Sequence, residues 1–339
     1  MKGISPEIQK LAPVILAEIQ KAKSILLHCH PSPDPDSVGS ALAMKFALEQ
    51  MGKKATVIKG DSEMPWAYRN LPGISGMVTK NFGEVDLSAY DLFVSVDAAV
   101  PLQISRYKTP EFPLSIPTIV IDHHVSNSKY GLINLVVPEY PATAQVLYDL
   151  FISWRIDITS QIAMNLFAGM YTDTGGFSYP STTPRTLQVA SALVEKAPDF
   201  PSVLSDIKNS NSQGFVRFSG LALSHIQIFC NGALAVSSIS APQISTQGID
   251  EADVRVSEVA SFMRTVPEWA ISICMAEVVP GRIRVSSRTN NGDKYDLSKL
   301  MKAIGGGGHK AAAASIVIDK GLDETIDIII RTAKELYNL

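Results

Sequence analysis

Cysteine is scarce in this chain. Its 339 residues include only Cys29, Cys230 and Cys274, and none of them belongs to a CxxC pair. This excludes a disulfide framework, a zinc ribbon and a cysteine-ligated iron–sulfur cluster. Long apolar runs are also missing, since none approaches the roughly 20 residues of a membrane-spanning helix. The net charge is only −3, so any surface that binds phosphate groups has to be local.

The rest of the composition is that of a globular protein. Hydrophobic residues make up 46% of the chain and charged residues 19%, and the length allows two domains that each bury a core. Near the N-terminus, Ile8, Leu11, Ile15 and Ile19 recur at helical spacing between charged residues, which predicts an amphipathic helix rather than a signal peptide. The sequence therefore predicts a cytoplasmic protein without a membrane partner.

Short apolar runs alternate with helical patterns in the first half of the chain. The predicted strands are residues 24–29, 55–59, 91–97 and 117–122, and the predicted helices are residues 41–51 and 142–154. This alternation is typical of an α/β fold with a doubly wound parallel sheet. Such sheets bind their ligands at the carboxyl ends of the strands.

A stretch rich in Pro, Ser, Asn and Asp at residues 197–214 indicates a domain boundary. We predict a first domain over residues 1–196, a linker with a helix over 197–228, and a smaller α/β domain over 229–339. The predicted strands of this second domain are residues 233–240, 269–278 and 282–288.

The loop after the first predicted strand carries three ionisable residues. His30, Asp34 and Asp36 follow an H-x3-D-x-D spacing, and its two carboxylates can point to opposite sides of the loop, each toward a different ion. Taken alone, the segment is equally compatible with an ordinary Asp-Pro turn.

Acids and imidazoles recur after later apolar segments. Asp97 ends a strand, where an aspartate is more often a helix cap. Asp122, His123 and His124 end the next strand, and adjacent histidines there would face opposite ways, one toward metal and one toward substrate. Asp173 follows an apolar helical run and precedes a glycine pair that lets another group approach closely.

Together these residues predict a metal centre. Carboxylates and imidazoles without thiolates suit Mn²⁺ or Mg²⁺ better than structural zinc, and imidazole favours Mn²⁺. The candidates exceed what one ion needs, so we predict two Mn²⁺ ions that share a bridging carboxylate, with Mg²⁺ or another divalent ion as the alternative.

The order H-x3-D-x-D, D, DHH and DTGG resembles the motifs of the DHH phosphoesterase superfamily. The segment GGGGHKAAAA at 305–314 resembles the glycine-rich signature of its associated C-terminal domain, with Ala314 where that family usually has glycine. Within the superfamily, the chain is most similar to enzymes that degrade short RNA, many of which also dephosphorylate 3′-phosphoadenosine 5′-phosphate (pAp). The resemblance implies an active site in the cleft between a DHH domain and the smaller domain.

The resemblance also assigns roles to single residues. It implies metal ligands at His30, Asp34, Asp36, Asp97, His123 and Asp173, of which His30 and Asp34 bind the first ion, Asp36 and His123 bind the second, and Asp97 bridges them. Asp97, Asp122 and His124 form the implied catalytic group: Asp122 orients His123 or its loop, and His124 faces the scissile phosphate. His28 and His225 have no place in the motifs, and we expect both to be structural.

The second domain carries the expected substrate contacts. Between Gly281 and Lys310, seven Lys or Arg residues stand against two acids, although a solvated basic face has the same composition. Arg288 ends a predicted strand and has a phosphate-binding counterpart in the family. Gly306, Gly307, Gly308 and His309 resemble the family's substrate-anchoring loop, although a run of glycines is also compatible with a hinge.

The sequence thus predicts a Mn²⁺-dependent phosphoesterase whose partners are short RNA or DNA oligonucleotides or small phosphonucleotides. The alternatives within enzymes are a phosphatase of pAp alone, a hydrolase of linear dinucleotides such as pApA, and an exopolyphosphatase-like enzyme. From another class, the alternative is a non-catalytic protein that binds nucleotides or RNA on the same scaffold. A homodimer is implied by the family resemblance alone.

Overall fold

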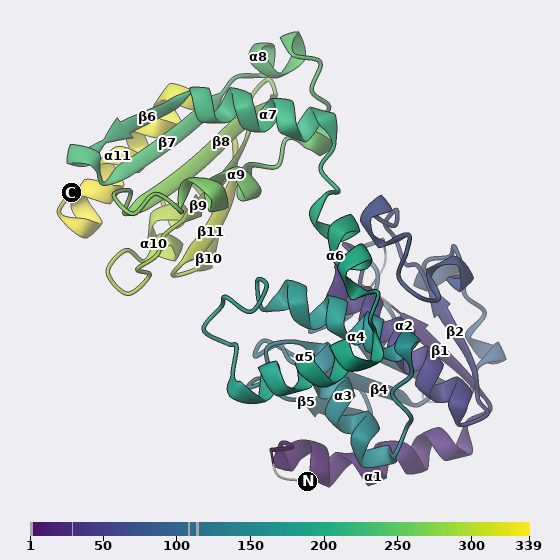
Figure 1. Cartoon of the computed structure of the whole chain (residues 1–339). Coiled ribbons are helices and arrows are strands. Elements are labelled where there is room, and N and C mark those ends of the chain that lie inside the picture. Colours follow the sequence, from purple (N-terminus) through teal and green to yellow (C-terminus); the bar gives the residue numbers. More distant parts are fainter. Residues whose placement is uncertain (1–2, 29, 108, 113–114) are drawn as a thin grey trace. The chain divides into compact units, whose positions relative to one another are not determined.

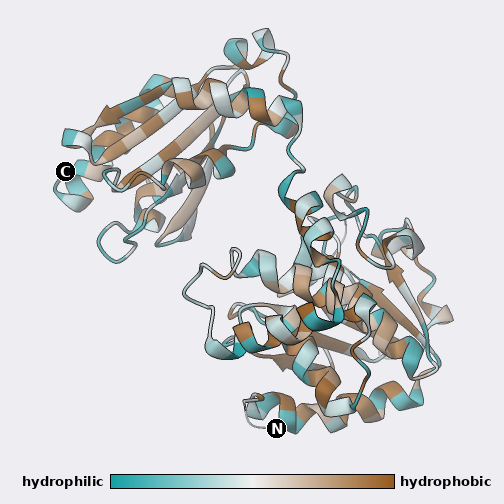
Figure 2. Ribbon diagram, viewed as in Figure 1, coloured by the Kyte–Doolittle hydropathy of each residue, from teal (hydrophilic) through white to brown (hydrophobic). Residues whose placement is uncertain are grey.

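The computed structural model describes residues 3–28, 30–107, 109–112 and 115–339, so Cys29, at the end of the first predicted strand, lies outside the described residues. The chain forms two compact units, residues 1–210 and 211–339, and each has its own sheet (Figure 1). In both units the strands are mostly hydrophobic, and the helices alternate hydrophobic and hydrophilic turns (Figure 2).

The sheet of the first unit has five parallel strands in the order β2-β1-β3-β4-β5. These strands are β1 (Ser24–His28), β2 (Lys54–Ile58), β3 (Leu92–Val96), β4 (Thr118–Asp122) and β5 (Ile133–Val136). Every residue of β3 and β4 is buried, as is usual for parallel strands covered on both faces. The chain runs from β1 outward to β2 and then returns to the other side of β1, so the winding reverses between β1 and β3.

One face of this sheet is covered by helices. The helices of the unit are α1 (Pro6–Lys21), α2 (Pro35–Gln50), α3 (Thr143–Trp154), α4 (Ser160–Asp173), α5 (Pro184–Lys196) and α6 (Phe200–Lys208). Their buried residues form one core with Ile25 and Leu27 of β1 and Val94 of β3. Leu26 and Phe93 point to the other face, where they join a cluster with aromatic side chains from the connections between the strands, among them Phe112.

The second unit contains a six-stranded mixed sheet in the order β10-β11-β9-β8-β7-β6. Its strands are β6 (Ile226–Phe229), β7 (Leu234–Ile239), β8 (Ile271–Val279), β9 (Arg282–Arg288), β10 (Gly307–His309) and β11 (Ala312–Ile318). One core includes α10 (Leu297–Lys302) and α11 (Leu322–Tyr337), and another includes α7 (Gln213–Ser224), α8 (Ala241–Thr246) and α9 (Val256–Met263). The prediction of a parallel sheet followed by a smaller α/β unit is confirmed.

The segment predicted as a linker, residues 197–228, is largely helical. Helix α6 belongs to the first unit, where Val203 is buried and Phe200, Leu204 and Ile207 pack against the core. Helix α7 belongs to the second unit. The stretch between the two helices is therefore only residues 209–212. Among the described residues, no helix has the length and apolar character needed to cross a bilayer.

Candidate metal centre

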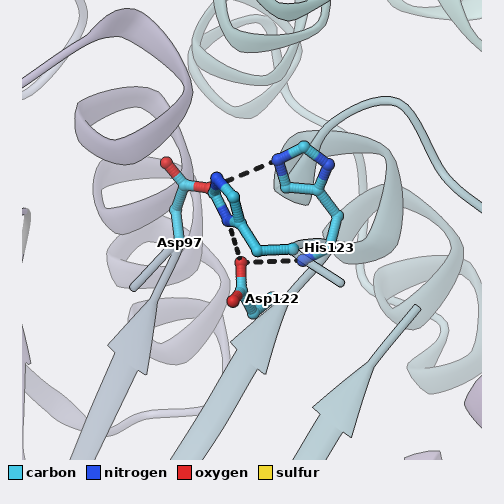
Figure 3. A group of neighbouring side chains, drawn as sticks. Asp97, Asp122 and His123 are labelled. Carbon is cyan, nitrogen blue, oxygen red and sulfur yellow. Dashed lines mark hydrogen bonds and ion pairs between the residues drawn. The ribbon is translucent and has the colours of Figure 1, made fainter. Parts of the chain in front are cut away.

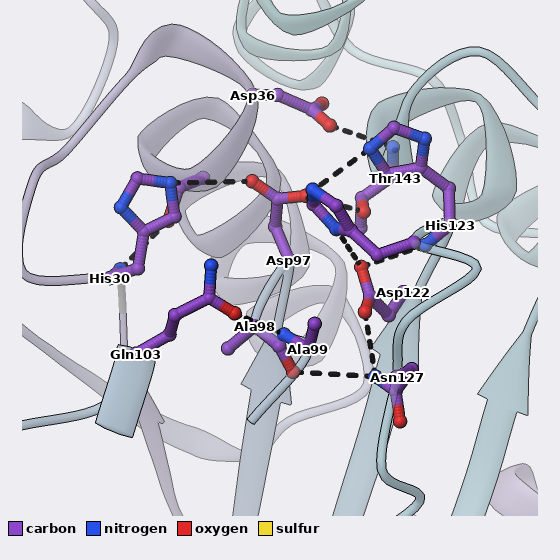
Figure 4. Close-up of polar contacts among 12 residues, drawn as sticks. His30, Asp36, Asp97, Ala98, Ala99, Gln103, Asp122, His123, Asn127 and Thr143 are labelled. Carbon is purple, nitrogen blue, oxygen red and sulfur yellow. Dashed lines mark hydrogen bonds and ion pairs between the residues drawn. The ribbon is translucent and has the colours of Figure 1, made fainter. Parts of the chain in front are cut away.

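Three neighbouring strands bring the predicted ligands to one edge of the first sheet. The loop after β1 carries His30, Asp97 follows β3, and Asp122 ends β4 directly before His123. Because β1, β3 and β4 are parallel and adjacent, their carboxyl ends meet at the point where the winding reverses. Figure 4 shows these side chains converging.

Asp97 lies at the centre of this cluster. Its Oδ2 is 3.7 Å from Nε2 of His30, and its Oδ1 is 3.7 Å from Nε2 of His123. The side chain is only 2% exposed, and the backbone φ is +56°, a left-handed conformation that is uncommon outside glycine and recurs at functional sites. Each carboxylate oxygen thus faces a different histidine, as required of a carboxylate that bridges two ions.

The described residues include three groups of possible ligands whose donor atoms lie within 4.8 Å of one another. Two groups contain only predicted ligands: His30, Asp34 and Asp97 in the first, and Asp36, His123 and Asp173 in the second. The third joins Asp97 and His123 with Asp122 and His124. In the first, Nε2 of His30 is 3.1 Å from Oδ2 of Asp34. In the second, Nε2 of His123 is 3.3 Å from Oδ2 of Asp173. The structure therefore brings together all six residues to which the sequence assigned metal binding.

The start of helix α2 positions two of the acids. Asp34 is the N-cap, and its Oδ1 accepts a hydrogen bond of 2.9 Å from the backbone N–H of Ser37. Pro35 occupies the first helical turn, where a missing N–H costs nothing. The Ser37 hydroxyl in turn accepts a 2.8 Å bond from the N–H of His30, which ties the loop to the helix. Asp36 lies in the first turn and is fully buried.

The start of helix α3 holds the carboxylates from the other side. The N–H groups of Thr143 and Ala144 donate to the two oxygens of Asp36 at 2.7 and 2.9 Å. The Thr143 hydroxyl donates to Oδ1 of Asp97 at 2.9 Å. Unpaired N–H groups at a helix N-terminus commonly bind anions. Sequence reasoning missed Thr143, although the predicted start of a helix at Ala142 was a usable signal.

Close packing of α2 against α4 sets the position of Asp173, the last residue of α4. A Cβ atom on Gly169 would lie 2.5 Å from Oδ1 of Asp36, and one on Gly39 would lie 2.3 Å from the carbonyl oxygen of Asn165. Both glycines therefore let helices α2 and α4 lie closer together than any larger residue would allow. The glycine pair after Asp173 also permits close approach, but by the rings of Tyr171 and Tyr179.

The two adjacent histidines face different surroundings. Nδ1 of His123 is 3.2 Å from the carbonyl oxygen of Tyr140, and its buried Nε2 points toward Asp97 and Asp173 without the geometry of a hydrogen bond. His124 is the more exposed ring, with 37% of its side chain accessible against 15% for His123. Figure 3 shows the ring of His123 turned toward Asp97.

Asp122 is fully buried and binds three neighbours. Its Oδ1 accepts the N–H of His123 at 2.8 Å and lies 2.7 Å from Nδ1 of His124. Its Oδ2 accepts a 2.6 Å bond from the amide of Asn127, a residue that sequence reasoning did not select. Asp122 thus contacts the backbone of His123 and the ring of His124, whereas the prediction assigned its influence to His123 or its loop.

The acids repel one another strongly when no cation lies between them. Burial raises the pKa of Asp36 to about 7, and the charge of Asp173 adds to this rise. Burial and the charge of Asp36 also raise the pKa of Asp97 well above its usual value. Burial alone would lower the pKa of His123, but the contact with Asp173 and the charge of Asp36 outweigh it and raise this pKa to about 9.

These properties fit divalent cations. Carboxylates of Asp34, Asp36, Asp97 and Asp173 lie close to imidazole nitrogens, and the buried Nε2 of His123 has no hydrogen-bond partner. Oxygen and imidazole donors without thiolate match Mn²⁺ or Mg²⁺. The site is therefore a candidate metal centre by its donor chemistry and by its charge.

The two histidines outside the motifs belong to neither group of predicted ligands. His28 ends β1 with its ring fully buried, and burial lowers its pKa to about 3, so it is neutral. His225 follows α7 and contacts the Leu221 carbonyl through Nδ1 and the Gln243 amide through Nε2.

In the second unit, Arg288 lies at the end of β9. Its Nε donates to the hydroxyl of Ser261 on α9 at 3.1 Å, and its Nη1 donates to the hydroxyl of Ser286 and the carbonyl of Ser287, each at 2.9 Å. The guanidinium is thus held in a defined orientation. Neither Ser261 nor Ser286 was selected from the sequence.

Packing accounts for part of the glycine run. A Cβ on Gly306 would lie 2.3 Å from the carbonyl oxygen of Ala314, and one on Gly308 would lie 2.6 Å from Cα of Ala313. A Cβ on Gly307 would meet open space. Residues Gly307–His309 form β10, which pairs with Ala312–Ala314 of β11. Two of the glycines are therefore needed for close packing of the chain, and His309 is exposed beside them.

Comparison with known proteins agrees with this geometry. Residues 24–170 match the family described as "DHH family, N-terminal domain". A bifunctional oligoribonuclease and PAP phosphatase, NrnA, of Thermus thermophilus is 27% identical over 99% of this chain and 98% of its own length. The NrnA of Bacillus subtilis, which bears the same description, is 23% identical over 89% of this chain and 92% of its own length.

Among solved structures, an exopolyphosphatase-related protein of Bacteroides fragilis superposes with a TM-score of 0.84 at 21% identity, over the whole of both chains. Fold, site and relatives together define a metal-dependent hydrolase that acts on phosphoester bonds. The family match to residues 24–170 and the relatives named NrnA confirm the resemblance to the DHH superfamily that the motifs indicated.

Proposed function

We propose that this chain is a two-metal phosphodiesterase that hydrolyses short RNA or DNA oligonucleotides to mononucleotides and also dephosphorylates pAp. The observation that carries the proposal is the placement of Asp97 between two ligand groups, 3.7 Å from a histidine of each. Two relatives that match along most of the chain are named as oligoribonucleases and PAP phosphatases, which supports these substrates.

Mn²⁺ is the proposed metal because imidazole nitrogens accompany the carboxylates in both groups. His30, Asp34 and Asp97 would hold one ion, and Asp36, His123, Asp173 and Asp97 the other. Two such ions, when bound, would lower the pKa of a water molecule that attacks phosphorus and would offset the charge that develops on the phosphoryl oxygens.

His124 is the proposed contact to the scissile phosphate. Its Nδ1 lies 2.7 Å from the Asp122 carboxylate, so Nδ1 carries the proton and Nε2 remains as the other ring atom for substrate. Asn127 and the backbone of His123 hold that carboxylate in place. A carboxylate fixed in this way stabilises the protonated ring when His124 takes part in a proton transfer.

In the second unit, Arg288 and His309 are the proposed contacts to a phosphate that is not cleaved. Ser261 and Ser286 hold the Arg288 guanidinium in place, which provides a positive charge at a fixed position for a phosphate group. Gly307 has open space on its Cβ side, which leaves room for the same ligand to approach the backbone closely. Recognition at both ends of a substrate would favour short chains over long polymers.

Turnover of defined substrates tests the proposal. With Mn²⁺ we expect mononucleotide release from an end-labelled RNA dinucleotide, adenosine 5′-monophosphate and phosphate from pAp, and slower hydrolysis of a long single-stranded RNA. Chelation with EDTA should stop all three reactions, and added Mn²⁺ should restore them. Labelled products are separated on denaturing gels, and phosphate is measured colorimetrically.

The substrate panel also separates the alternatives. Turnover of pAp alone would indicate a dedicated phosphatase, and turnover of polyphosphate alone would indicate an exopolyphosphatase-like enzyme. Equal rates on long and short RNA would contradict selection by length. Binding of dinucleotide that is insensitive to EDTA and without turnover would indicate a non-catalytic binding protein.

Replacing Arg288 with lysine should raise KM for the dinucleotide about tenfold, the size expected when a charge-assisted hydrogen bond is lost. The change in kcat should be much smaller, because Arg288 is proposed to bind a phosphate that does not react. Steady-state kinetics measure both constants. Arg331→Lys, an exposed position on α11, is the matched control. A loss confined to kcat would contradict this role.

A cytoplasmic location and a homodimer stay predictions. An RNA trinucleotide labelled at its 5′ end distinguishes the two polarities of cleavage, because attack from the 5′ end first releases a labelled mononucleotide and attack from the 3′ end first leaves a labelled dinucleotide.

A further inference from the structure

A buried polar network begins at the ring of His123. Nδ1 of this ring lies 3.2 Å from the carbonyl oxygen of Tyr140. A carbonyl oxygen can only accept, so Nδ1 carries a proton, and Nε2, which points toward Asp97 and Asp173, is the atom that provides the lone pair for a metal when the ring is neutral. The position of one backbone carbonyl therefore decides both the tautomer and the direction of a proposed metal ligand.

The carbonyl of Tyr140 is held from two directions. On the backbone, the N–H of Tyr140 donates to the carbonyl of Val137 at 3.0 Å and closes a tight turn. On the side chain, the phenol donates to Oδ2 of Asp149 at 2.6 Å and accepts the N–H of Ser5 at 3.0 Å. Tyr140 is only 7% exposed. The phenol hydroxyl therefore both donates a hydrogen bond and accepts one.

Asp149 continues the network. It lies on α3, is fully buried, and pairs with Arg185 of α5 as well as with the Tyr140 phenol. A buried ion pair contributes little net stability, because the cost of removing both charges from water offsets their attraction. Such a pair instead fixes the position of the groups bound to it, and here the group bound to Asp149 is the phenol of Tyr140.

We propose that Tyr140, held by Asp149 and Arg185, is a positioning residue that sets the affinity of one of the two ion sites, the one formed by Asp36, His123 and Asp173. The inference rests on the proposed two-ion centre. Within the part of the chain that the structure describes, no hydrogen bond or ion pair joins this network to His30 or Asp34 of the other group, so its effect should be selective.

The test is Mn²⁺ binding to the full chain without substrate, measured by calorimetry and by the electron paramagnetic resonance signal of free Mn²⁺. Tyr140→Phe should weaken one ion about tenfold, the lower end of the effect of losing a partner of a metal ligand. The other ion should stay within about twofold. His123→Ala identifies the affected ion, since it should weaken the same one.

Tyr148→Phe is the matched control. Tyr148 lies on α3 one residue before Asp149, and its ring centre is 5.9 Å from the Arg185 guanidinium carbon. Among the described residues, it forms no hydrogen bond with His123 or with the Asp149 carboxylate. Both ions should bind this variant as they bind the wild type. Unchanged binding by Tyr140→Phe, or equal weakening of both ions, would overturn the inference. A wild-type chain that binds fewer than two ions would instead overturn the two-ion proposal.

Folding is checked by thermal unfolding in EDTA. If Tyr140→Phe does not fold, Ser5→Pro tests the inference instead, because it removes the N–H that donates a hydrogen bond to the phenol. The φ of Ser5 is −53°, which proline adopts readily. We expect about a threefold weakening of the same ion, in line with the modest net strength of one neutral hydrogen bond. Wild-type affinity of Ser5→Pro for both ions would count against the inference.

Discussion

Replacing Asp97 with asparagine is expected to lower kcat on the dinucleotide by on the order of 10³-fold, comparable to removing a main electrostatic contact of a transition state. Asp97 lies 3.7 Å from Nε2 of both His30 and His123, so both proposed ion sites lose the same negative ligand. Asparagine preserves the shape of the side chain and tolerates the left-handed backbone, so the fold should persist.

Asp91→Asn is the control for this variant. Asp91 directly precedes strand β3, whereas Asp97 directly follows it, and Asp91 accepts the N–H groups of Lys23 and Ser24 at the opposite edge of the sheet. Its turnover should match the wild type. We would measure initial rates for all three proteins at saturating Mn²⁺. An Asp97→Asn variant with more than a tenth of wild-type kcat would exclude a bridging role.

Divalent metal is expected to raise the free energy of unfolding substantially. At a free Mn²⁺ concentration 100-fold above Kd, each bound ion adds about 2.7 kcal/mol, so two ions add about 5 kcal/mol. The native chain gathers the carboxylates of Asp34, Asp36, Asp97 and Asp173, and the unfolded chain separates them. Urea unfolding with Mn²⁺ and with EDTA measures the difference. Equal midpoints would contradict a metal centre at this site.

In EDTA, lowering the pH from about 8 to about 6 should stabilise the native state. The pKa of Asp36 is raised from 3.8 to about 7, so in this range the native chain binds a proton that the unfolded chain does not. The pKa of His123 is raised from 6.5 to about 9, so its contribution is complete below pH 6.5 and is lost as the pH rises through 9. Both groups act in the same direction.

With saturating Mn²⁺ the pH dependence should reverse, because metal binding needs deprotonated ligands. Midpoints measured at both pH values, with and without metal, provide the comparison. A metal-free protein that becomes less stable toward pH 6 would show that Asp36 and His123 do not dominate the titration.

The sequence predicted the strands that carry the site within about a residue, because each is a short apolar run that ends at an ionisable group. It missed β5, Ile133–Val136, whose residues are mostly half-buried and follow a polar loop. It placed a linker with a helix at residues 197–228, where Pro, Ser and Asn indicated a domain boundary. Phe200, Val203 and Ile207 of this segment recur at helical spacing and pack on the first core.

The side chains of the candidate site could be predicted from the sequence, but the backbone groups that hold them could not. His30, Asp34, Asp36, Asp97 and His123 stand in spaced motifs that can be read without coordinates. The contacts that hold them come largely from the backbone: the N–H groups of Thr143 and Ala144, and the carbonyl of Tyr140. Every residue carries these groups, so no pattern of side chains reveals which of them will face a ligand.

The left-handed backbone of Asp97 connects the stability of the chain with its proposed activity. A non-glycine residue in this conformation costs roughly 1 kcal/mol or more, a cost that glycine avoids. Glycine there would also relieve the repulsion among the buried acids. The aspartate at position 97 is therefore present at a cost in stability, which is the exchange of stability for activity expected of a residue in a functional site.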